Sequence, residues 1–471
     1  MPANLSLRIR WGMLVSRVSG VVREHGGEGL MHNAMALMSV QFVRKSLPLI
    51  TIPYLARVLG PGGWGLVATF QSLALTMVLL IEFGFPLSAT RRVACCRESM
   101  EKLSEIWAGV VGVQCLLAIG AIVITGLISL RVPLLRNHIW LTIWALVWAI
   151  AEGMNPVWYF LGVERMKVIA GLEICSKIAM AAGIVATVHS ANDIHRVMAI
   201  QGIAPVLSLA VAMWFIRRDI SFRAPTLALM REAMRSSWPL FIMRSAESIY
   251  TLANAFTLGV LAGPGVVGYF AGPEKISRAL FGFFNPVRDA LYPRLSKLMH
   301  ESPAQAARLA RFGIITTGLG GLAMGLFAFL FAPFLVKVVL GEEFGPAVVV
   351  LRILAILPPL ISVTQSVGMG WLLPLGRDRA ITRAMALGGG LNLVLALLFV
   401  PRFAHIGIAW AVVCAEALVC LLVLYAAIAD PERRLPIFRP RSSGKNVRPG
   451  EPAADEPVNS KPKSTLIGSL K

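Results

Sequence analysis

Apolar stretches long enough to cross a lipid bilayer recur along almost the whole of this 471-residue chain. A transmembrane helix needs about 20 mostly apolar residues. The stretches lie at roughly 33–56, 64–84, 106–130, 138–162, 168–188 and 197–216, and then at roughly 237–262, 268–293, 312–336, 347–373, 381–400 and 406–428. They leave almost no chain for a soluble domain. We therefore predict an all-α membrane protein with about 12 transmembrane helices.

Composition excludes a soluble core, and the placement of the charges argues against a nucleic-acid partner. Hydrophobic residues make up 56% of the chain and charged residues 15%, whereas a soluble domain carries about 25% charge. The net charge of +20 comes from Lys and Arg that lie between the apolar stretches. A nucleic-acid-binding protein would instead gather them on one soluble face or arm.

Lys and Arg concentrate in alternate connections, as they do on the cytoplasmic side of membrane proteins. The rich set includes Arg91, Arg92, Arg97, Lys102, Arg165, Lys167, Arg217, Arg218, Arg223, Arg231, Arg235, Arg294, Lys297, Arg308, Arg311, Arg377, Arg379 and Arg383. The opposite set has Arg57, Arg131, Arg136, Arg196, Lys337 and Arg402. With an even number of spans, this bias predicts that both termini are cytoplasmic.

The spans divide the chain into five parts. Residues 1–32 form a basic cytoplasmic arm, which either lies along the inner leaflet as an interfacial helix or only fixes the topology. We predict an N-terminal six-helix bundle over 33–216, a cytoplasmic linker over 217–236 and a C-terminal six-helix bundle over 237–428. Residues 431–471 are rich in Pro, Ser, Lys and Glu, which predicts a disordered cytoplasmic tail.

An internal repeat relates the two predicted bundles. The end of the first span reads Gly60-Pro61-Gly62, and the end of the seventh reads Gly263-Pro264-Gly265, at an offset of 203 residues. The same offset places polar residues on polar residues: Gln41 on Arg244, Arg44 on Glu247, Thr51 on Asn254, Gln71 on Glu274 and Arg91 on Arg294. Six spans between copies give both halves one topology, so they are predicted to be parallel repeats.

Charged residues interrupt the spans at a cost of about 2.5–3.5 kcal/mol each, so they usually face a wet cavity or a partner. On helical spacing, those of spans one, two, seven and eight fall on faces that could line a cavity between the halves. The candidate cations are Arg44, Lys45, Arg244, Lys275, Arg278 and Arg288, and the candidate counter-charges are Glu82, Glu247, Glu274 and Asp289.

Local explanations compete with the cavity at several of these positions. Glu274 and Arg278 are four residues apart and could form a salt bridge within one helix. Arg288 and Asp289 lie near a cytoplasmic end, where they could reach the headgroups. Elsewhere, Glu173 and Lys177 have the same spacing and favour a local pair.

Several segments resemble one membrane-protein family. LPLITIPYLARVLGPGGWGLVATFQSLALTMVLLIEFGF, followed by PLSATRRVA, resembles the first two helices of bacterial polysaccharide repeat-unit flippases. WYFLGVERMKV at 158–168 is similar to that family's aromatic turn after span four, and GYFAGPEKISRALFGFFNPVRDALYPRLSKL at 268–298 to its span eight. The resemblance covers essentially residues 33–428. The family belongs to the multidrug/oligosaccharidyl-lipid/polysaccharide exporter superfamily.

The resemblance implies alternating access and movement of undecaprenyl-diphosphate-linked oligosaccharide across the bacterial inner membrane, for O-antigen, capsule or exopolysaccharide synthesis. Arg44, Lys45, Arg244 and Arg278 become candidate contacts for the diphosphate or for anionic sugars, since guanidinium donates paired hydrogen bonds to phosphate. Glu247 and Glu82 become candidates for coupling to H+ or Na+ or for holding these cations. Trp158, Tyr159 and Tyr250 could stack on sugar rings.

The same resemblance implies membrane lipids, a polysaccharide polymerase and chain-length proteins as partners. No cofactor is expected, and the six cysteines show no metal-ligand spacing.

Two other functions stay open. A small-molecule or drug antiporter of the same superfamily would share the fold, although it would favour acidic and aromatic cavity residues over cations. A membrane enzyme of polysaccharide assembly, such as a polymerase or ligase, would need a catalytic site on a sizeable outer loop. The predicted outer connections are short, and only 341–346 carries two carboxylates, Glu342 and Glu343. We therefore predict a transporter and not an enzyme.

Overall fold

The computed structural model describes residues 27–282, 294, 295, 297–299 and 301–429, and this part of the chain is helical without a strand. The first helices are α2 (Gly27–Glu82), α3 (Phe85–Cys95), α4 (Met100–Arg131), α5 (Pro133–Asn137), α6 (Ile139–Gly153), α7 (Val157–Gly162), α8 (Met166–Thr187), α9 (Ile194–Ile216) and α10 (Leu227–Leu252). They are followed by α11 (Asn254–Ala262), α12 (Pro264–Gly282), α14 (Pro303–Leu330), α15 (Ala332–Val339), α16 (Ala347–Leu354), α17 (Leu357–Val367) and α18 (Asp378–Ile428). Short 3-10 turns at Ala191–Asp193 and Glu342–Phe344 and a π-turn at Gly368–Leu372 join some of them.

The all-α membrane class is confirmed. Within the described residues, seven helical segments are long and apolar enough to cross a bilayer. The two longest, Ile50–Cys95 and Asp378–Ile428, contain 46 and 51 residues, about twice what one crossing needs. Each is interrupted, at Gly60 (φ 65°) and at Ala404 (φ 48°). The exact number of about 12 spans stays a prediction.

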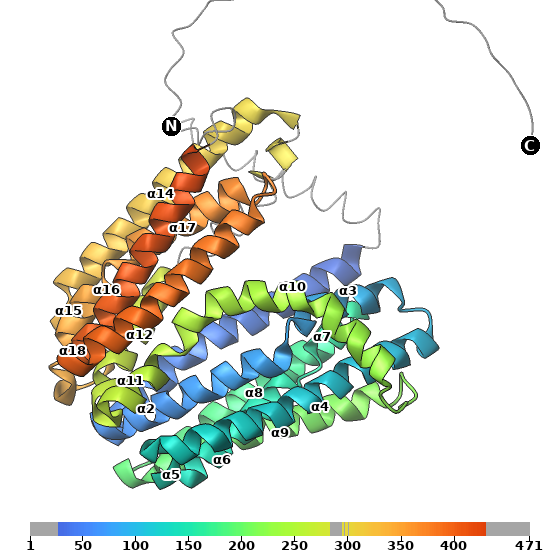
Figure 1. The fold of residues 1–471 in the computed structure, drawn as a ribbon, viewed down its shortest axis with the longest axis horizontal. Helices are drawn as coiled ribbons and strands as arrows, with labels where there is room; N and C mark the ends of the chain where they lie inside the picture. The colour runs from blue at the N-terminus through green and yellow to red at the C-terminus, as the bar shows by residue number, and fades with distance from the viewer. Residues whose placement is uncertain (1–26, 283–293, 296, 300, 430–471) are drawn as a thin grey trace, which may run out of the picture.

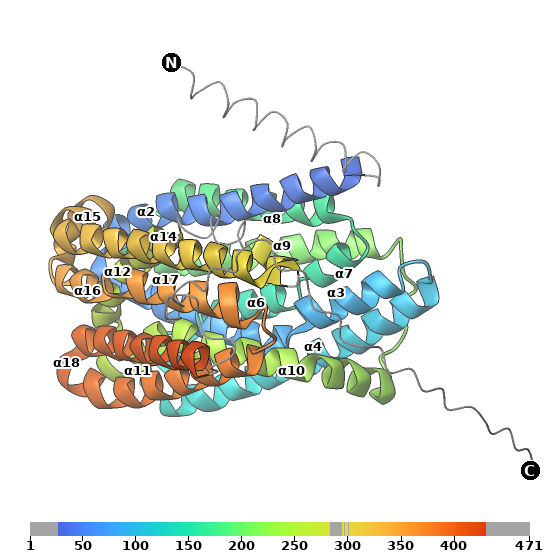
Figure 2. The same ribbon diagram turned by 90° about the horizontal axis from the view of Figure 1, so that it is seen from above.

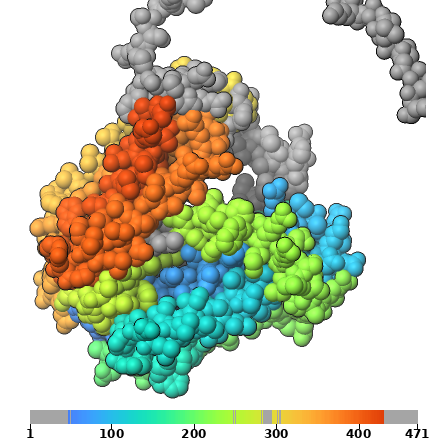
Figure 3. All heavy atoms as spheres, viewed as in Figure 1, coloured from blue at the N-terminus to red at the C-terminus, as the bar shows by residue number. Residues whose placement is uncertain are grey.

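The helices gather into two groups that meet at one end. Figure 1 shows α4, α6, α8 and α9 beside α2 in one group, and α14, α16, α17 and α18 in the other. The groups converge where α2 and α11 turn, and they diverge toward the end at which α3 ends and α14 begins. Figure 3 shows the orange and red surface of the second group against the green and blue surface of the first.

The long helices of the second group run side by side. α14, α17 and α18 are nearly parallel in both views (Figure 1 and Figure 2), as helices that cross the same bilayer do. Their outward faces are apolar: on α14, Leu319, Leu322 and Leu326 are all exposed. An exposed apolar band of this kind marks a lipid-facing surface.

Part of the predicted linker 217–236 is helical, because α10 begins at Leu227 and packs against α4. Glycine makes this possible: a Cβ at Gly109 would lie 2.8 Å from the carbonyl oxygen of Leu229. The predicted seventh span is also divided. It ends as α10 at Leu252 and resumes as α11 at Asn254.

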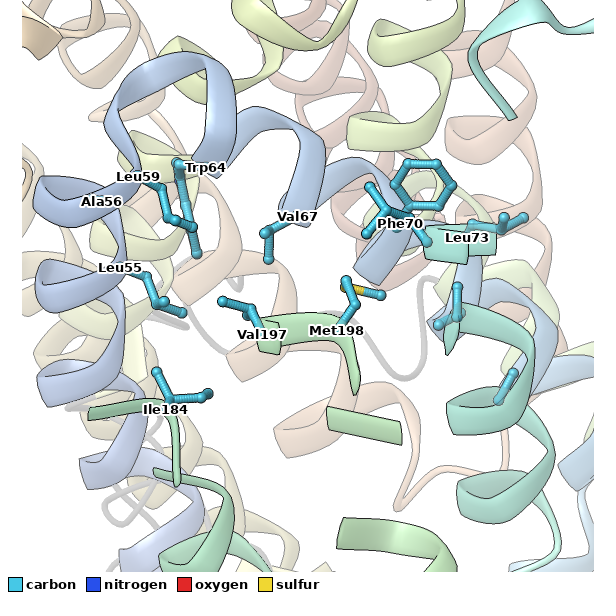
Figure 4. Close-up of a cluster of buried hydrophobic side chains, with 14 of the residues drawn as sticks. Leu55, Ala56, Leu59, Trp64, Val67, Phe70, Leu73, Ile184, Val197 and Met198 are labelled. Atoms are coloured by element: carbon cyan, nitrogen blue, oxygen red, sulfur yellow. The ribbon is translucent and has the colours of Figure 1, made fainter. Parts of the chain in front are cut away.

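A cluster of large buried side chains supports the first group. Leu55, Leu59 and Trp64 of α2 point toward Val197 of α9 and Ile184 of α8 in Figure 4. Because α2 reverses at Gly60, side chains on both sides of the turn reach the same core. The turn therefore converts one long apolar run into two packed helices.

The aromatic segment at 158–168 forms a closed turn and not a binding surface. Trp158 and Tyr159 are 1% exposed and pack on Trp107, with ring centroids 5.3 and 5.7 Å away. The expectation that they stack on sugars is therefore wrong. In the following turn, Glu164 adopts φ 60°, and the hydrogen bond from Arg97 holds the pKa of the Glu164 carboxyl below its ordinary value.

The repeated glycine turns bring the two groups into direct backbone contact. A Cβ on Gly65 would lie 1.8 Å from the carbonyl oxygen of Pro264, and a Cβ on Gly268 would lie 2.1 Å from that of Pro61. Both pairs are related by the offset of 203 residues. Gly60 and Gly263 open these turns with positive φ, 65° and 86°, which glycine adopts at little cost. The two halves therefore touch through equivalent contacts.

We expect Gly65→Ala and Gly268→Ala each to lower the free energy of unfolding by about 1–3 kcal/mol, since an added methyl must push two backbones apart. Thermal unfolding in detergent measures the effect. Gly62→Ala and Gly265→Ala are matched controls from the same turns, where a Cβ meets nothing within 4 Å. Equal melting temperatures for all four variants would contradict the contact.

Candidate functional site

An ion pair joins the end of the second predicted span to the seventh. Arg244 Nη1 of α10 lies 3.1 Å from Glu82 Oε2 of α2, with the side chains 36% and 24% exposed. Glu82 is the last residue of α2, because the chain turns at Phe83 and Gly84 with positive φ. Pairing lowers the cost of holding each charge away from bulk water. The structure thus brings together one predicted cation and one predicted counter-charge.

A series of side-chain hydrogen bonds joins α12 to α2 and α9. Lys275 Nζ of α12 donates to Gln71 Oε1 of α2 at 3.0 Å, and Gln71 Nε2 donates to Gln201 Oε1 of α9 at 3.2 Å. The ammonium also lies 4.8 Å from the ring centroid of Trp64, where the aromatic face attracts a cation. Lys275 is therefore held by neutral partners at the crossing of α2 and α12.

Glu274 and Arg278 form the local salt bridge that their spacing allows. The guanidinium Nη2 lies 2.8 Å from Glu274 Oε1 and also donates to the carbonyl oxygen of Thr251 at 3.0 Å. These groups line a cavity of about 170 Å³ within the second group of helices. Local pairing and cavity lining are thus compatible for this pair.

Five other candidates lie outside the described part of the structure. Arg288 and Asp289 fall within 283–293, and the side chains of Arg44, Lys45 and Glu247 are likewise outside the described residues. That these residues line a central cavity therefore stays a prediction.

Glu416 is a cavity residue that the sequence reasoning missed. It lies on α18, is 5% exposed and lines the same cavity as Glu274, Arg278 and Gln365. A carboxylate inside an apolar run is costly, so the rule that selected the other charges could have selected this one. The cavity therefore carries two carboxylates and one guanidinium.

Two further polar contacts within the membrane region also escaped the sequence reasoning. Asn392 Nδ2 donates to Asn254 Oδ1 at 2.7 Å in a buried pair that joins α18 to α11. Lys177 Nζ of α8 lies 3.7 Å from Glu152 Oε1 of α6. The four-residue spacing in the sequence had favoured Glu173 as the partner of Lys177. Both contacts join residues far apart in sequence, so no local pattern indicates them.

The described residues of the site offer no cluster of metal ligands. Within the residues that the structure describes, no group of three or more His, Cys, Asp and Glu side chains could hold a metal ion. The site can instead recognise a charged ligand through its arginine, lysine and carboxylate side chains.

Comparisons with known proteins agree on one family and one fold. Residues 30–299 match the family model described as polysaccharide biosynthesis protein. Two relatives carry the name "Putative O-antigen transporter". The one from Escherichia coli (strain K12) is 30% identical over 399 residues, which cover 84% of this chain and 96% of the relative. The one from Shigella dysenteriae is 26% identical, with 84% of this chain and 99% of the relative covered.

Solved structures extend the likeness of fold. The lipid II flippase MurJ in an inward closed conformation matches with a TM-score of 0.67 and 14% identity, over 83% of this chain and 87% of that one. An inward-facing multidrug resistance MATE transporter matches with a TM-score of 0.60 and 16% identity, over 80% and 92%. At these identities the likeness concerns the fold alone.

A charge exchange tests the Glu82–Arg244 pair. We expect Glu82→Gln and Arg244→Gln each to destabilise the protein by about 1–3 kcal/mol, because each removes one charge of the ion pair. The double variant Glu82→Arg with Arg244→Glu should recover most of that loss. Melting temperatures of the four proteins in one detergent measure the coupling. An exchanged variant that is no more stable than the Glu82→Gln and Arg244→Gln variants would show that the ion pair contributes no coupling.

Proposed function

This chain belongs to the polysaccharide biosynthesis protein family, and from that membership we propose that it flips lipid-linked oligosaccharide across the membrane by alternating access. It is a multi-pass membrane transporter and not an enzyme. The proposed cargo is an undecaprenyl-diphosphate-linked repeat unit for O-antigen, capsule or exopolysaccharide synthesis. The O-antigen transporter relatives support the pathway, and the charges of the chain support the class of headgroup.

The observation that carries the proposal is the set of arginines and lysines held inside a membrane transporter by ion pairs and neutral oxygens. Arg244 faces Glu82, and Lys275 faces Gln71. A diphosphate can enter an apolar region only if cations replace its water, and guanidinium offers it two parallel hydrogen bonds. In the proposed mechanism the headgroup competes with Glu82 for Arg244, while Arg44, Lys45 and Arg278 supply further contacts.

In the proposed alternating-access cycle, this structure is a state that is closed at the end where α2 and α12 cross. The contacts of Gly65 and Gly268, together with the Lys275–Gln71 hydrogen bond, hold the two groups together there. For the cargo to leave on that side, these contacts must separate, while the opposite ends of the groups come together. Lys275 has neutral partners in the closed state, so opening breaks hydrogen bonds without separating an ion pair.

We further propose that carboxylates couple transport to H+ or Na+. The candidates from the sequence are Glu82, Glu247, Glu274 and Asp289, and Glu416 joins them because it lines a cavity with Glu274. Neutralising a carboxylate beside Arg278 would free the guanidinium for the cargo. In this scheme both termini are cytoplasmic, the membrane is the bacterial inner membrane, and a polymerase and chain-length proteins act on the product.

A drug antiporter is the second candidate, and one observation favours it. The cavity in the second group has Glu274 and Glu416 in its lining against the single cation Arg278, a balance that suits a cationic drug. Efflux of a cationic dye from cells that express this protein would support it. Unchanged dye accumulation, together with restored polysaccharide, would favour the flippase.

Cells that lack this protein are expected to accumulate lipid-linked repeat units on the cytoplasmic face. An Arg244→Ala variant that inserts normally should restore surface polysaccharide at least about tenfold less well than the unaltered chain, since one charge-assisted contact contributes about 1.5–3 kcal/mol. Arg379→Ala, an exposed cation at the start of α18, should restore it fully. Full restoration by Arg244→Ala and also by Arg44→Ala would remove these residues from the proposed site.

Glu416→Gln is expected to abolish the response of transport to an imposed ion gradient, because an amide neither binds a proton near neutral pH nor attracts Na+. Proteoliposomes with a proton or sodium gradient and labelled lipid-linked substrate measure this response. Glu343→Gln, an exposed carboxylate in an outer connection, is the control. If the unaltered protein responds to neither gradient, the coupling proposal is wrong.

A further inference from the structure

A second charged hollow lies at the end of the first helix group, where α3, α4 and α10 meet. It has a volume of about 540 Å³ and is open on one side. Arg91 and Arg92 reach it from α3, Lys102 from the first turn of α4, and Glu232 from α10. The residues discussed above as a transport site belong to other elements or to other turns of α10. This hollow, called the corner pocket below, therefore needs its own explanation.

Two cations of the corner pocket have no carboxylate of their own. Arg92 is paired with Glu232, at 2.6 Å, and Glu105 is shared with Arg223, at 3.6 Å. Among the described residues, no salt bridge or hydrogen bond of the Arg91 or Lys102 side chain is found. Both side chains are exposed. The pocket thus presents two unneutralised cations beside a pair that holds its wall in place.

The lining also has an apolar part. Leu87, Ile106, Leu229 and Leu240 supply it, beside the smaller side chains of Ser88, Ser236, Cys95 and Cys96, and Leu87 is 52% exposed. The first residue of α10, Leu227, is 82% exposed at the same end. A polar ligand in water would gain nothing from such a rim. A ligand with a charged head and apolar chains would use both parts.

We propose that the corner pocket binds an anionic phospholipid, with its phosphate between Arg91 and Lys102 and an acyl chain along Leu87 and Leu240. Arginine and lysine are the groups that hold lipid phosphates at the membrane surface. The basic residues at this end belong to the set expected on the cytoplasmic side, where anionic lipid is available. By joining α3, α4 and α10, the lipid would fix the helix that carries Arg244.

The pocket is assigned to bulk membrane lipid and not to the transported lipid diphosphate. Its two unpaired cations match one phosphate group, and its lining includes the exposed Leu87. A bilayer phospholipid could place its phosphate on the cations and an acyl chain on this leucine. The assignment depends on the membrane location alone, so it stands or falls independently of the transported substrate.

Native mass spectrometry of the full-length protein in neutral detergent tests the proposal. The probes are phosphatidylglycerol and phosphatidylcholine with identical acyl chains. Arg91→Gln with Lys102→Gln should weaken phosphatidylglycerol binding at least about tenfold, because both exposed cations that would attract the phosphate are lost. Arg379→Gln with Arg383→Gln removes two exposed cations from the start of α18 and should leave that binding unchanged. Phosphatidylcholine should bind all three proteins alike.

Cysteine labelling locates the bound lipid. Cys95 lines the corner pocket and is exposed, so phosphatidylglycerol should slow its reaction with a polar maleimide in the unaltered protein. The slowing should disappear in the Arg91→Gln, Lys102→Gln variant and persist in the control. A Cys96→Ser background removes the adjacent thiol, which also lines the pocket, and mapping of labelled peptides separates Cys95 from the remaining cysteines.

Three results would overturn the proposal. Equal loss of phosphatidylglycerol from both double variants would show a general effect of charge. Equal affinity of the unaltered protein for the two phospholipids would show that no anionic headgroup is recognised. Displacement of phosphatidylglycerol by an equal concentration of undecaprenyl phosphate, with protection of Cys95, would assign the pocket to the polyprenyl substrate instead.

Discussion

The α2 and α12 backbones come into contact at Gly65 and Gly268, and the arrangement of the two helix groups depends on that approach. A side chain at either position would overlap a carbonyl oxygen of the opposite turn. With none present, the helices are close enough for Lys275 to reach Gln71 and for Ser72 Oγ to accept from the Phe256 amide at 3.1 Å. The polar links between the groups therefore follow from a contact between backbones.

Such a crossing suits a part of the protein that must open. Contacts between small residues are short-ranged, and the nearby hydrogen bonds join mostly neutral groups, so separation costs less than breaking a buried ion pair. The ion pairs lie elsewhere: Glu82 with Arg244, and Glu274 with Arg278. The chain thus keeps ion pairs where a charged cargo could exchange with them, whereas Lys275 and Arg57, which reach across between the groups, donate to the neutral acceptors Gln71 and the Val338 carbonyl oxygen.

The lipid-facing surface and the charged sites use the same helices for different purposes. α10 packs its first turns on α4, contributes Glu232 to the corner pocket and carries Arg244 farther along. A lipid held at the first of these sites would restrain the helix that serves the second. One helix therefore connects the membrane surface to the charged interior.

The sequence alone determined the helical membrane class, because a helix satisfies the backbone of a long continuous apolar run in lipid within the run itself. It also indicated which turns are equivalent, since Gly60 and Gly263 need a conformation that other residues avoid, and its motifs indicated the family. The local pair of Glu274 and Arg278 could be predicted because four residues make one helical turn. Boundaries were less certain: the helix that was expected to start at 237 begins at Leu227, where packing on α4 replaces water.

Only the tertiary structure decided which distant residues meet. Lys177 finds Glu152 on another helix, and Asn392 finds Asn254, because partners are chosen by helix crossing and not by spacing. The sequence does not show whether Trp158 and Tyr159 contact a sugar or pack in the core. Their burial against Trp107 shows that they pack in the core. Periodicity shows which face of a helix a residue occupies, but the neighbour of that face depends on how the helices are arranged.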